Sequence, residues 1–101
     1  MNEQPTFADF TLCVNSAFRV VDGSPEAFEL RLKGVTAGAS NPGYEVFSLI
    51  LRGPADRFLP QSIHKLDHDR LGSLEIFLVP VGEDQEGYEY EAVFNRILHA
   101  N

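Results

Sequence analysis

The 101-residue sequence has no tryptophan, a single cysteine and no cluster of basic residues. Because Cys13 has no possible partner within the chain, an internal disulfide is excluded, and the lone thiol is typical of a reducing compartment. Eight lysine and arginine residues stand against 15 aspartate and glutamate residues, which gives a formal net charge of −7. That charge repels phosphate backbones and anionic membranes, so we expect no binding to nucleic acid or to a membrane.

Long apolar runs are also missing. No segment approaches the ~20 apolar residues of a membrane-spanning helix. The first five residues, Met-Asn-Glu-Gln-Pro, lack the positive start and apolar core of a signal peptide. We therefore expect a cytoplasmic protein, with signal-independent export left open. The length predicts a single domain over residues 1–101, with residues 1–5 disordered.

The sequence instead contains strand-like segments separated by turn residues. In these segments, apolar residues recur at every second position, which is the period of a pleated strand. Glycine, proline, asparagine or aspartate residues stand between the segments, as they do in turns. The predicted strands are residues 17–22, 26–35, 44–52, 62–67, 72–81 and 88–98.

A short helix is predicted before the first strand. Thr6 can cap it, with Asp9 three residues later as the partner of a capping box. Phe7, Phe10 and Val14 then share one helix face, because they are spaced by three and four residues. We expect this helix to lie across an open end of the sheet as a plug.

Six strands joined by short connections favour an all-β fold, a small antiparallel barrel with meander-like strand order. Closure leaves no long apolar edge exposed. A bulge is expected at Gly34, where the alternation changes phase. An α+β fold is the alternative. Because narrow barrels fill with side chains, we expect the aromatic residues to form a solid core: Phe18, Phe28, Phe47, Phe77, Tyr88, Tyr90 and Phe94.

No residue pattern indicates catalysis, so we predict no enzyme, no catalytic residues and no cofactor. The sequence contains neither a Gly-x-Ser-x-Gly motif nor a phosphate-binding glycine loop. His64 and His68 have the spacing of a helical metal site, but on a strand their Cα atoms lie roughly 13 Å apart. No metal site is therefore predicted, and a calcium-stabilised loop at Asp67, Asp69 or residues 83–86 is a weaker alternative.

Acidic residues gather near the end of the chain. Residues 83–87 are predicted to form an exposed hairpin loop, and Glu89 and Glu91 to share the outer face of the last strand. We expect these two carboxylates to lie opposite basic neighbours such as Arg31 or Lys33. A solvated acidic face explains the pattern better than a binding site.

The segment between the third and fourth strands is the most distinctive irregular stretch. It is either a structural corner or a surface that anchors a partner, and Arg52 is expected to pair with Asp56 across it. The candidate partner-binding residues are Arg52, Gly53, Pro54, Phe58, Leu59, Pro60 and Gln61.

Several short motifs occur in order along the chain. They are Arg-Gly-Pro-Ala at 52–55, Phe-Leu-Pro-Gln at 58–61, Phe-Leu-Val-Pro-Val at 77–81 and Tyr-Glu-Ala-Val-Phe-Asn at 90–95. Together they resemble a family of short bacterial proteins described as a domain of unknown function, over about residues 7–98. The resemblance implies a structural or assembly role beside fibre proteins of the phage-tail-collar kind, and it carries no catalytic residue.

Two functions follow as hypotheses. The first is a non-enzymatic structural or protein-interaction module, within a phage-tail-like or surface-fibre assembly. It would contact a protein partner or a second copy through the corner described above and through any unpaired strand. The alternative is a small-ligand-binding or enzymatic barrel. Its aromatic-lined pocket would use Tyr88, Tyr90 and Phe28, with His64 or His68 as the polar group.

Overall fold

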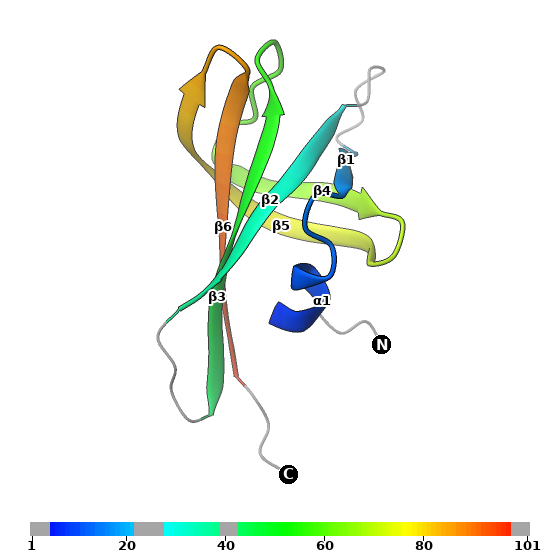
Figure 1. The fold of residues 1–101 in the computed structure, drawn as a ribbon, viewed down its shortest axis with the longest axis vertical. Helices are drawn as coiled ribbons and strands as arrows, with labels where there is room; N and C mark the ends of the chain where they lie inside the picture. The colour runs from blue at the N-terminus through cyan, green and yellow to red at the C-terminus, as the bar shows by residue number, and fades with distance from the viewer. Residues whose placement is uncertain (1–4, 22–27, 39–42, 98–101) are drawn as a thin grey trace.

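The computed structural model describes residues 5–21, 28–38 and 43–97. It confirms one short N-terminal helix and six strands (Figure 1). The predicted positions 1–4, 22, 26–27, 39–42 and 98 lie outside the described residues. The elements are α1 (Phe7–Thr11), β1 (Ala17–Val20), β2 (Glu29–Ala37), β3 (Tyr44–Pro54), β4 (Ser62–His68), β5 (Gly72–Asp84) and β6 (Gly87–Ile97).

The six antiparallel strands close into a barrel in the order β1-β2-β3-β6-β5-β4. Each half of the chain, β1-β2-β3 and β4-β5-β6, is a three-stranded meander. The predicted meander order is nevertheless wrong for the whole barrel, because β3 pairs with β6 and β1 pairs with β4. The reason lies in the β3–β6 ladder, which joins the two strands along their full length from Tyr44↔Ile97 to Pro54↔Gly87.

Strand β5 changes partners along its length. Its first part, Gly72 to Leu78, pairs with β4, whereas Val79 to Asp84 pairs with β6. The register shifts between Pro80 and Gly82. Proline has no N–H to donate and glycine packs no side chain, so this is where a strand can bend. Figure 1 shows the result: the first part of β5 runs across β6, and the second part runs alongside it.

The helix α1 covers the core, as predicted. The capping box is present, with Thr6 accepting from the Asp9 N–H and Asp9 accepting from the Thr6 N–H. The Phe10 side chain is fully buried, and its ring centroid lies 5.8 Å from that of Phe47 and 5.3 Å from that of Phe94. The helix thus adds Phe10 to the aromatic cluster that Phe47 and Phe94 of the strands form.

Of the seven aromatic residues predicted for the core, Phe18, Phe47 and Tyr90 are buried, whereas Phe28, Tyr88 and Phe94 are half-buried and pack against it. Leu30, Leu32, Leu49, Leu51, Leu66, Leu78 and Tyr90 are all fully buried, and the register shift between Leu32 and Gly34 confirms the bulge. Phe77 is not a core residue but is 49% exposed, because its neighbours Ile76 and Leu78 take the inward positions. Pro5, predicted to be disordered, is buried.

Candidate interaction surface

Two of the seven predicted partner-binding residues hold the fold together. Gly53 is buried, and a Cβ atom at this position would lie 2.7 Å from Cδ2 of Leu30. Leu59 is also buried, and its N–H donates to the Tyr90 hydroxyl over 3.0 Å. Burial raises the pKa of Tyr90, which keeps the hydroxyl neutral. The corner is therefore anchored to the barrel by its own backbone.

Arg52 is held by two carboxylates. Its guanidinium lies 2.6 Å from Asp84 and 3.5 Å from Glu89. The hydrogen bond to Asp84 raises the pKa of Arg52 and lowers the pKa of Asp84. The same Asp84 oxygen accepts from the backbone N–H groups of Glu86 and Gly87. Arg52 thus fastens the β5–β6 turn to β3.

These contacts correct three predictions. Glu89 lies opposite Arg52 in the β3–β6 register, not opposite Arg31 or Lys33. The partner of Arg52 across the turn is Asp84 rather than Asp56. The predicted loop 83–87 is mostly strand, with turn residues only at 85–86. The carboxylate that closes this turn lies far from Arg52 in sequence, so no local pattern could identify the pair.

The other corner residues are more accessible. Phe58 is 54% exposed, and its ring packs edge-on against Tyr88 with centroids 5.1 Å apart. Pro60 is exposed, and its carbonyl accepts from Nε2 of His64 over 2.8 Å. Gln61 is exposed and Pro54 half-buried. The corner therefore presents one large apolar side chain to solvent.

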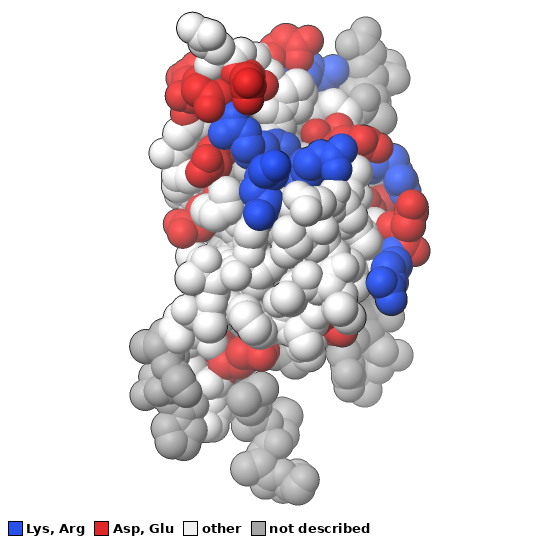
Figure 2. Space-filling view, viewed as in Figure 1, with Lys and Arg blue, Asp and Glu red and all other residues white. Residues whose placement is uncertain are grey.

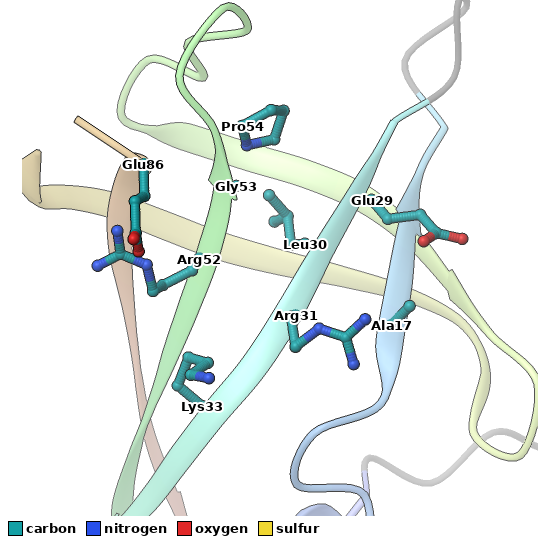
Figure 3. A pocket seen from close by; sticks show the side chains of 9 residues that line it. All are labelled: Ala17, Glu29, Leu30, Arg31, Lys33, Arg52, Gly53, Pro54 and Glu86. Carbon is teal, nitrogen blue, oxygen red and sulfur yellow. The ribbon is translucent and has the colours of Figure 1, made fainter. Parts of the chain in front are cut away.

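A groove beside β2 and β3 contains several cationic side chains. Figure 2 shows lysine and arginine side chains in a band just below a group of acidic ones. The groove has a volume of about 440 Å³. In Figure 3, Arg52 points towards Glu86 whereas Arg31 points the other way, towards Ala17. Arg31 also donates to the Asn15 carbonyl. Arg31 and Arg52 thus diverge within the groove, and Arg52 is already paired with two carboxylates.

His68 is buried beside α1, and all its polar atoms are used. Nδ1 accepts from the N–H groups of Arg70 and Leu71, over 3.0 and 3.2 Å. Nε2 therefore carries the proton and donates to the Ser16 hydroxyl over 2.7 Å. That hydroxyl donates in turn to the Cys13 carbonyl. The chain of bonds joins the β4–β5 turn to the end of α1 and fits neutral imidazole only.

This network predicts a loss of stability in mild acid. Burial lowers the pKa of His68, so the unfolded chain binds a proton at higher pH than the folded chain does. The stabilisation is complete above the unfolded pKa of about 6.5 and is lost as the pH falls below it. Thermal unfolding between about pH 7.5 and pH 5.5 should show a fall in Tm for the wild type.

Two asparagine variants provide the controls for this pH dependence. In His68→Asn, the side-chain oxygen can still accept from the turn N–H groups but does not titrate, so the fall in Tm should be smaller. His64→Asn changes the half-buried histidine of β4, which is not part of this network, and should retain the wild-type fall. Equal pH dependence in all three proteins would show that His68 is not the titrating group.

An opening separates β5 from β6 on the barrel wall. The ladder between them runs only from Asp84↔Gly87 to Val79↔Glu91. Beyond Val79, β5 bends away, and a cleft of about 300 Å³ lies between residues 75–77 and 92–95. The sequence analysis placed no site here. One local signal in the sequence is compatible with it: Pro80 stands two residues before Gly82 within an apolar strand, a combination typical of a bend.

The backbone of β5 directs hydrogen-bonding groups into this opening. Successive residues of an antiparallel strand point their N–H and C=O groups to opposite sides. The Val21 N–H donates to the Lys65 carbonyl over 2.8 Å. The backbone N–H and C=O groups of the odd-numbered residues of β4 therefore point to β1, and those of the even-numbered residues point to β5. In this register the even-numbered residues of β5 bond to β4. The backbone N–H and C=O groups of Ser73, Glu75 and Phe77 therefore point into the opening.

The same alternation determines where the backbone N–H and C=O groups of β6 point. The Gly38 N–H donates to the Val46 carbonyl over 2.8 Å. The backbone N–H and C=O groups of the even-numbered residues of β3 therefore point to β2, and those of the odd-numbered residues point to β6. Because Phe47 lies opposite Phe94, even-numbered residues of β6 bond to β3. Val93 and Asn95 thus point their N–H and C=O groups into the opening. Within residues 43–97, these groups have no ladder partner.

Three exposed apolar side chains lie at or next to the opening, and we call them the apolar patch. Ile63 is 63% exposed, Phe77 49% and Val93 64%. Ile63 and Phe77 are direct neighbours in the β4–β5 register, and Phe77 and Val93 both line the cleft. Exposed apolar side chains that gather beside a cleft mark a contact surface more often than isolated ones do.

Asp67 and Asp69, the candidates for a calcium-stabilised loop, each contact another side chain. Asp67 accepts from the Ser73 hydroxyl over 2.7 Å, and Asp69 lies 3.5 Å from Arg19. No group of three or more potential ligands occurs among residues 5–21, 28–38 and 43–97. In the same part of the chain, no helix has the length and apolar character needed to cross a membrane.

Comparison with known proteins places the chain in a family. No curated protein and no solved structure matches it. A family model described as a domain of unknown function (DUF6916) matches residues 5–94. That span includes the helix, the first five strands and most of β6, and therefore both sides of the opening. The chain belongs to the DUF6916 family.

Proposed function

We propose that the chain is a non-enzymatic protein-interaction module that binds its partner at the opening between β5 and β6. The observation that supports this is the apolar patch beside the cleft. Other large apolar side chains are exposed as well, among them Leu12, Val21, Phe58 and Val81. Phe77 and Val93, however, line the same cleft, and Ile63 is the register neighbour of Phe77. Each side chain of the patch is already partly buried, so covering its exposed part contributes about 1–2 kcal/mol.

The corner is the second contact surface in this proposal. Phe58 and Gln61 are exposed there, while Leu59 and Gly53 hold the backbone in place. A rigid corner with an exposed aromatic side chain loses little conformational entropy on binding. A place in a phage-tail-like or surface-fibre assembly is the finer form of the proposal, and the motif resemblance described above supports it.

The alternative function, a ligand-binding or enzymatic barrel, has less support. The Tyr90 hydroxyl is bound by Leu59 at the corner, and Arg57 covers the Phe28 ring at 4.6 Å. His68 is bound to Ser16 beside α1. The aromatic and polar groups that this hypothesis requires are therefore each engaged with other parts of the chain.

The patch predicts a specific loss of binding in Phe77→Ser. A partner would be isolated with the tagged wild-type chain from its source cells, purified, and titrated against each variant. Loss of a buried aromatic contact typically costs 2 kcal/mol or more, so affinity should fall by about 30-fold. Because Phe77 is half exposed in the free chain, its Tm should change little.

Val81→Ser is the matched control for this variant. Val81 is 50% exposed on the same strand but lies in the bulge, away from the cleft lining. Its binding should equal that of the wild type. If Phe77→Ser also binds with wild-type affinity, the patch is not the binding surface and the proposal fails.

A further inference from the structure

We propose that the partner docks by adding an extended strand to the open edge of β6, at Val93 and Asn95. This inference rests on the proposed function and adds to it a binding mode and a partner chemistry. Strand addition needs backbone N–H and C=O groups that point outward from a sheet edge. The alternation along β3 and β6 provides such groups at both residues.

In the part of the chain that the structure describes, the edge of β6 at residues 92–95 lacks the features that usually prevent strand addition. Natural proteins protect open edges with proline, lysine, bulges or a covering loop. Residues 92–95 are Ala-Val-Phe-Asn, with no charge and no proline. The β3–β6 register is continuous through them, without a bulge. The Val93 side chain beside this edge is well exposed. This stretch is thus a regular, uncharged template for another strand.

The cleft explains how an added strand would gain specificity. Its walls include Ile76 and Ala92, which are buried core residues, together with the half-buried Phe94. Its volume of about 300 Å³ lies at the lower limit of small-molecule pockets. Alternate side chains of an added strand point to the same side, so an apolar side chain can enter the cleft beside Phe77.

Charge decides which strand fits best. Glu91 lies where the β5–β6 ladder ends, and Glu75 lines the cleft. Lys65, opposite Glu75 in the register, offsets one of these charges. A second copy of the chain would bring the same carboxylates and a net charge of −7, which opposes association. We therefore assign the edge to a strand from another protein in which apolar residues alternate with lysine or arginine.

A pair of synthetic peptides tests this partner chemistry. One is an end-blocked peptide of alternating valine and lysine, and the other replaces each lysine with glutamate. NMR titration of the full chain should show shifts at residues 73–77 and 92–95 with the lysine peptide. It should also show slower amide exchange at Val93 and Asn95. The glutamate peptide should bind about tenfold more weakly or worse.

Substitutions at Val93 test the backbone contact itself. In Val93→Pro the N–H that faces the opening is lost, but the ladder to β3 does not use it. The chain should therefore fold and lose peptide affinity by about tenfold or more. Val93→Thr keeps both the N–H and the β-branch, so its affinity should stay within about threefold of the wild type. Asn95→Pro repeats the test at the second open residue if Val93→Pro does not fold.

Three results would overturn the inference. The first is lysine-peptide binding that neither proline variant weakens, or that shifts residues on another edge. The second is concentration-dependent protection of Val93 and Asn95 without peptide, which would assign the edge to a second copy. The third is a natural partner that loses affinity for Phe77→Ser but not for Val93→Pro. That last result would leave the proposed function intact and remove only strand addition.

Discussion

Phe47→Ala is expected to lower the free energy of unfolding by about 3–5 kcal/mol, the range for an emptied aromatic core site. The Phe47 side chain is 1% exposed. Its ring stacks on Phe94 with centroids 4.9 Å apart, and it also contacts Phe10 and Phe7 of α1. Removing it leaves a cavity between the helix and two strands. Urea unfolding followed by circular dichroism would measure the change.

Phe77→Ala is the matched control for this prediction. It removes the same side chain from a half-exposed position, so the free energy of unfolding should change by about 1 kcal/mol or less. Phe94 is half-buried, and Phe94→Ala should fall between the two. If Phe47→Ala and Phe77→Ala destabilise equally, the helix does not pack on the core as described.

Gly87→Ala is the second change with a large expected effect. Gly87 has a φ angle of +157°, and a Cβ atom there would lie 1.9 Å from the Gly53 carbonyl oxygen. That oxygen belongs to the backbone of β3, so only a shift of the strand can relieve the clash. We expect a loss of more than about 3 kcal/mol, measured by the same urea unfolding.

Gly82→Ala provides the comparison on the same hairpin. A Cβ atom at Gly82 would meet nothing closer than the Glu89 Cβ at 4.0 Å. The substitution should therefore change the free energy of unfolding by about 1 kcal/mol or less. A wild-type-like Gly87→Ala would show that β3 and β6 do not approach each other as closely as the structure indicates.

Local patterns in the sequence were sufficient to predict the helix and the six strands. Alternation of apolar and polar residues predicted all six strands, because it reflects which residues face the core. Thr6 and Asp9 predicted the helix start, since a capping box is formed within one turn. Phe77 was assigned to the core because strand alternation identifies two faces but does not say which is inner when both carry apolar residues.

The strand order and the opening could not be read from local patterns. Pairing of β3 with β6 and of β1 with β4 joins residues that are far apart in sequence. The partners of Arg52, His68 and Tyr90 are likewise set by that pairing. Pro80 is compatible with an irregular strand but does not indicate a cleft, which exists because β5 leaves β6 beyond Val79.

The amino-acid sequence alone determined the β class, the six strands and the N-terminal helix, because each depends on neighbours within a few residues. Tertiary structure alone decided how the two meanders join and which apolar side chains stay outside. It also decided that, among the described residues, β6 has no ladder partner on its β5 side at Val93 and Asn95. These outcomes depend on contacts between distant segments, which form only when the barrel closes.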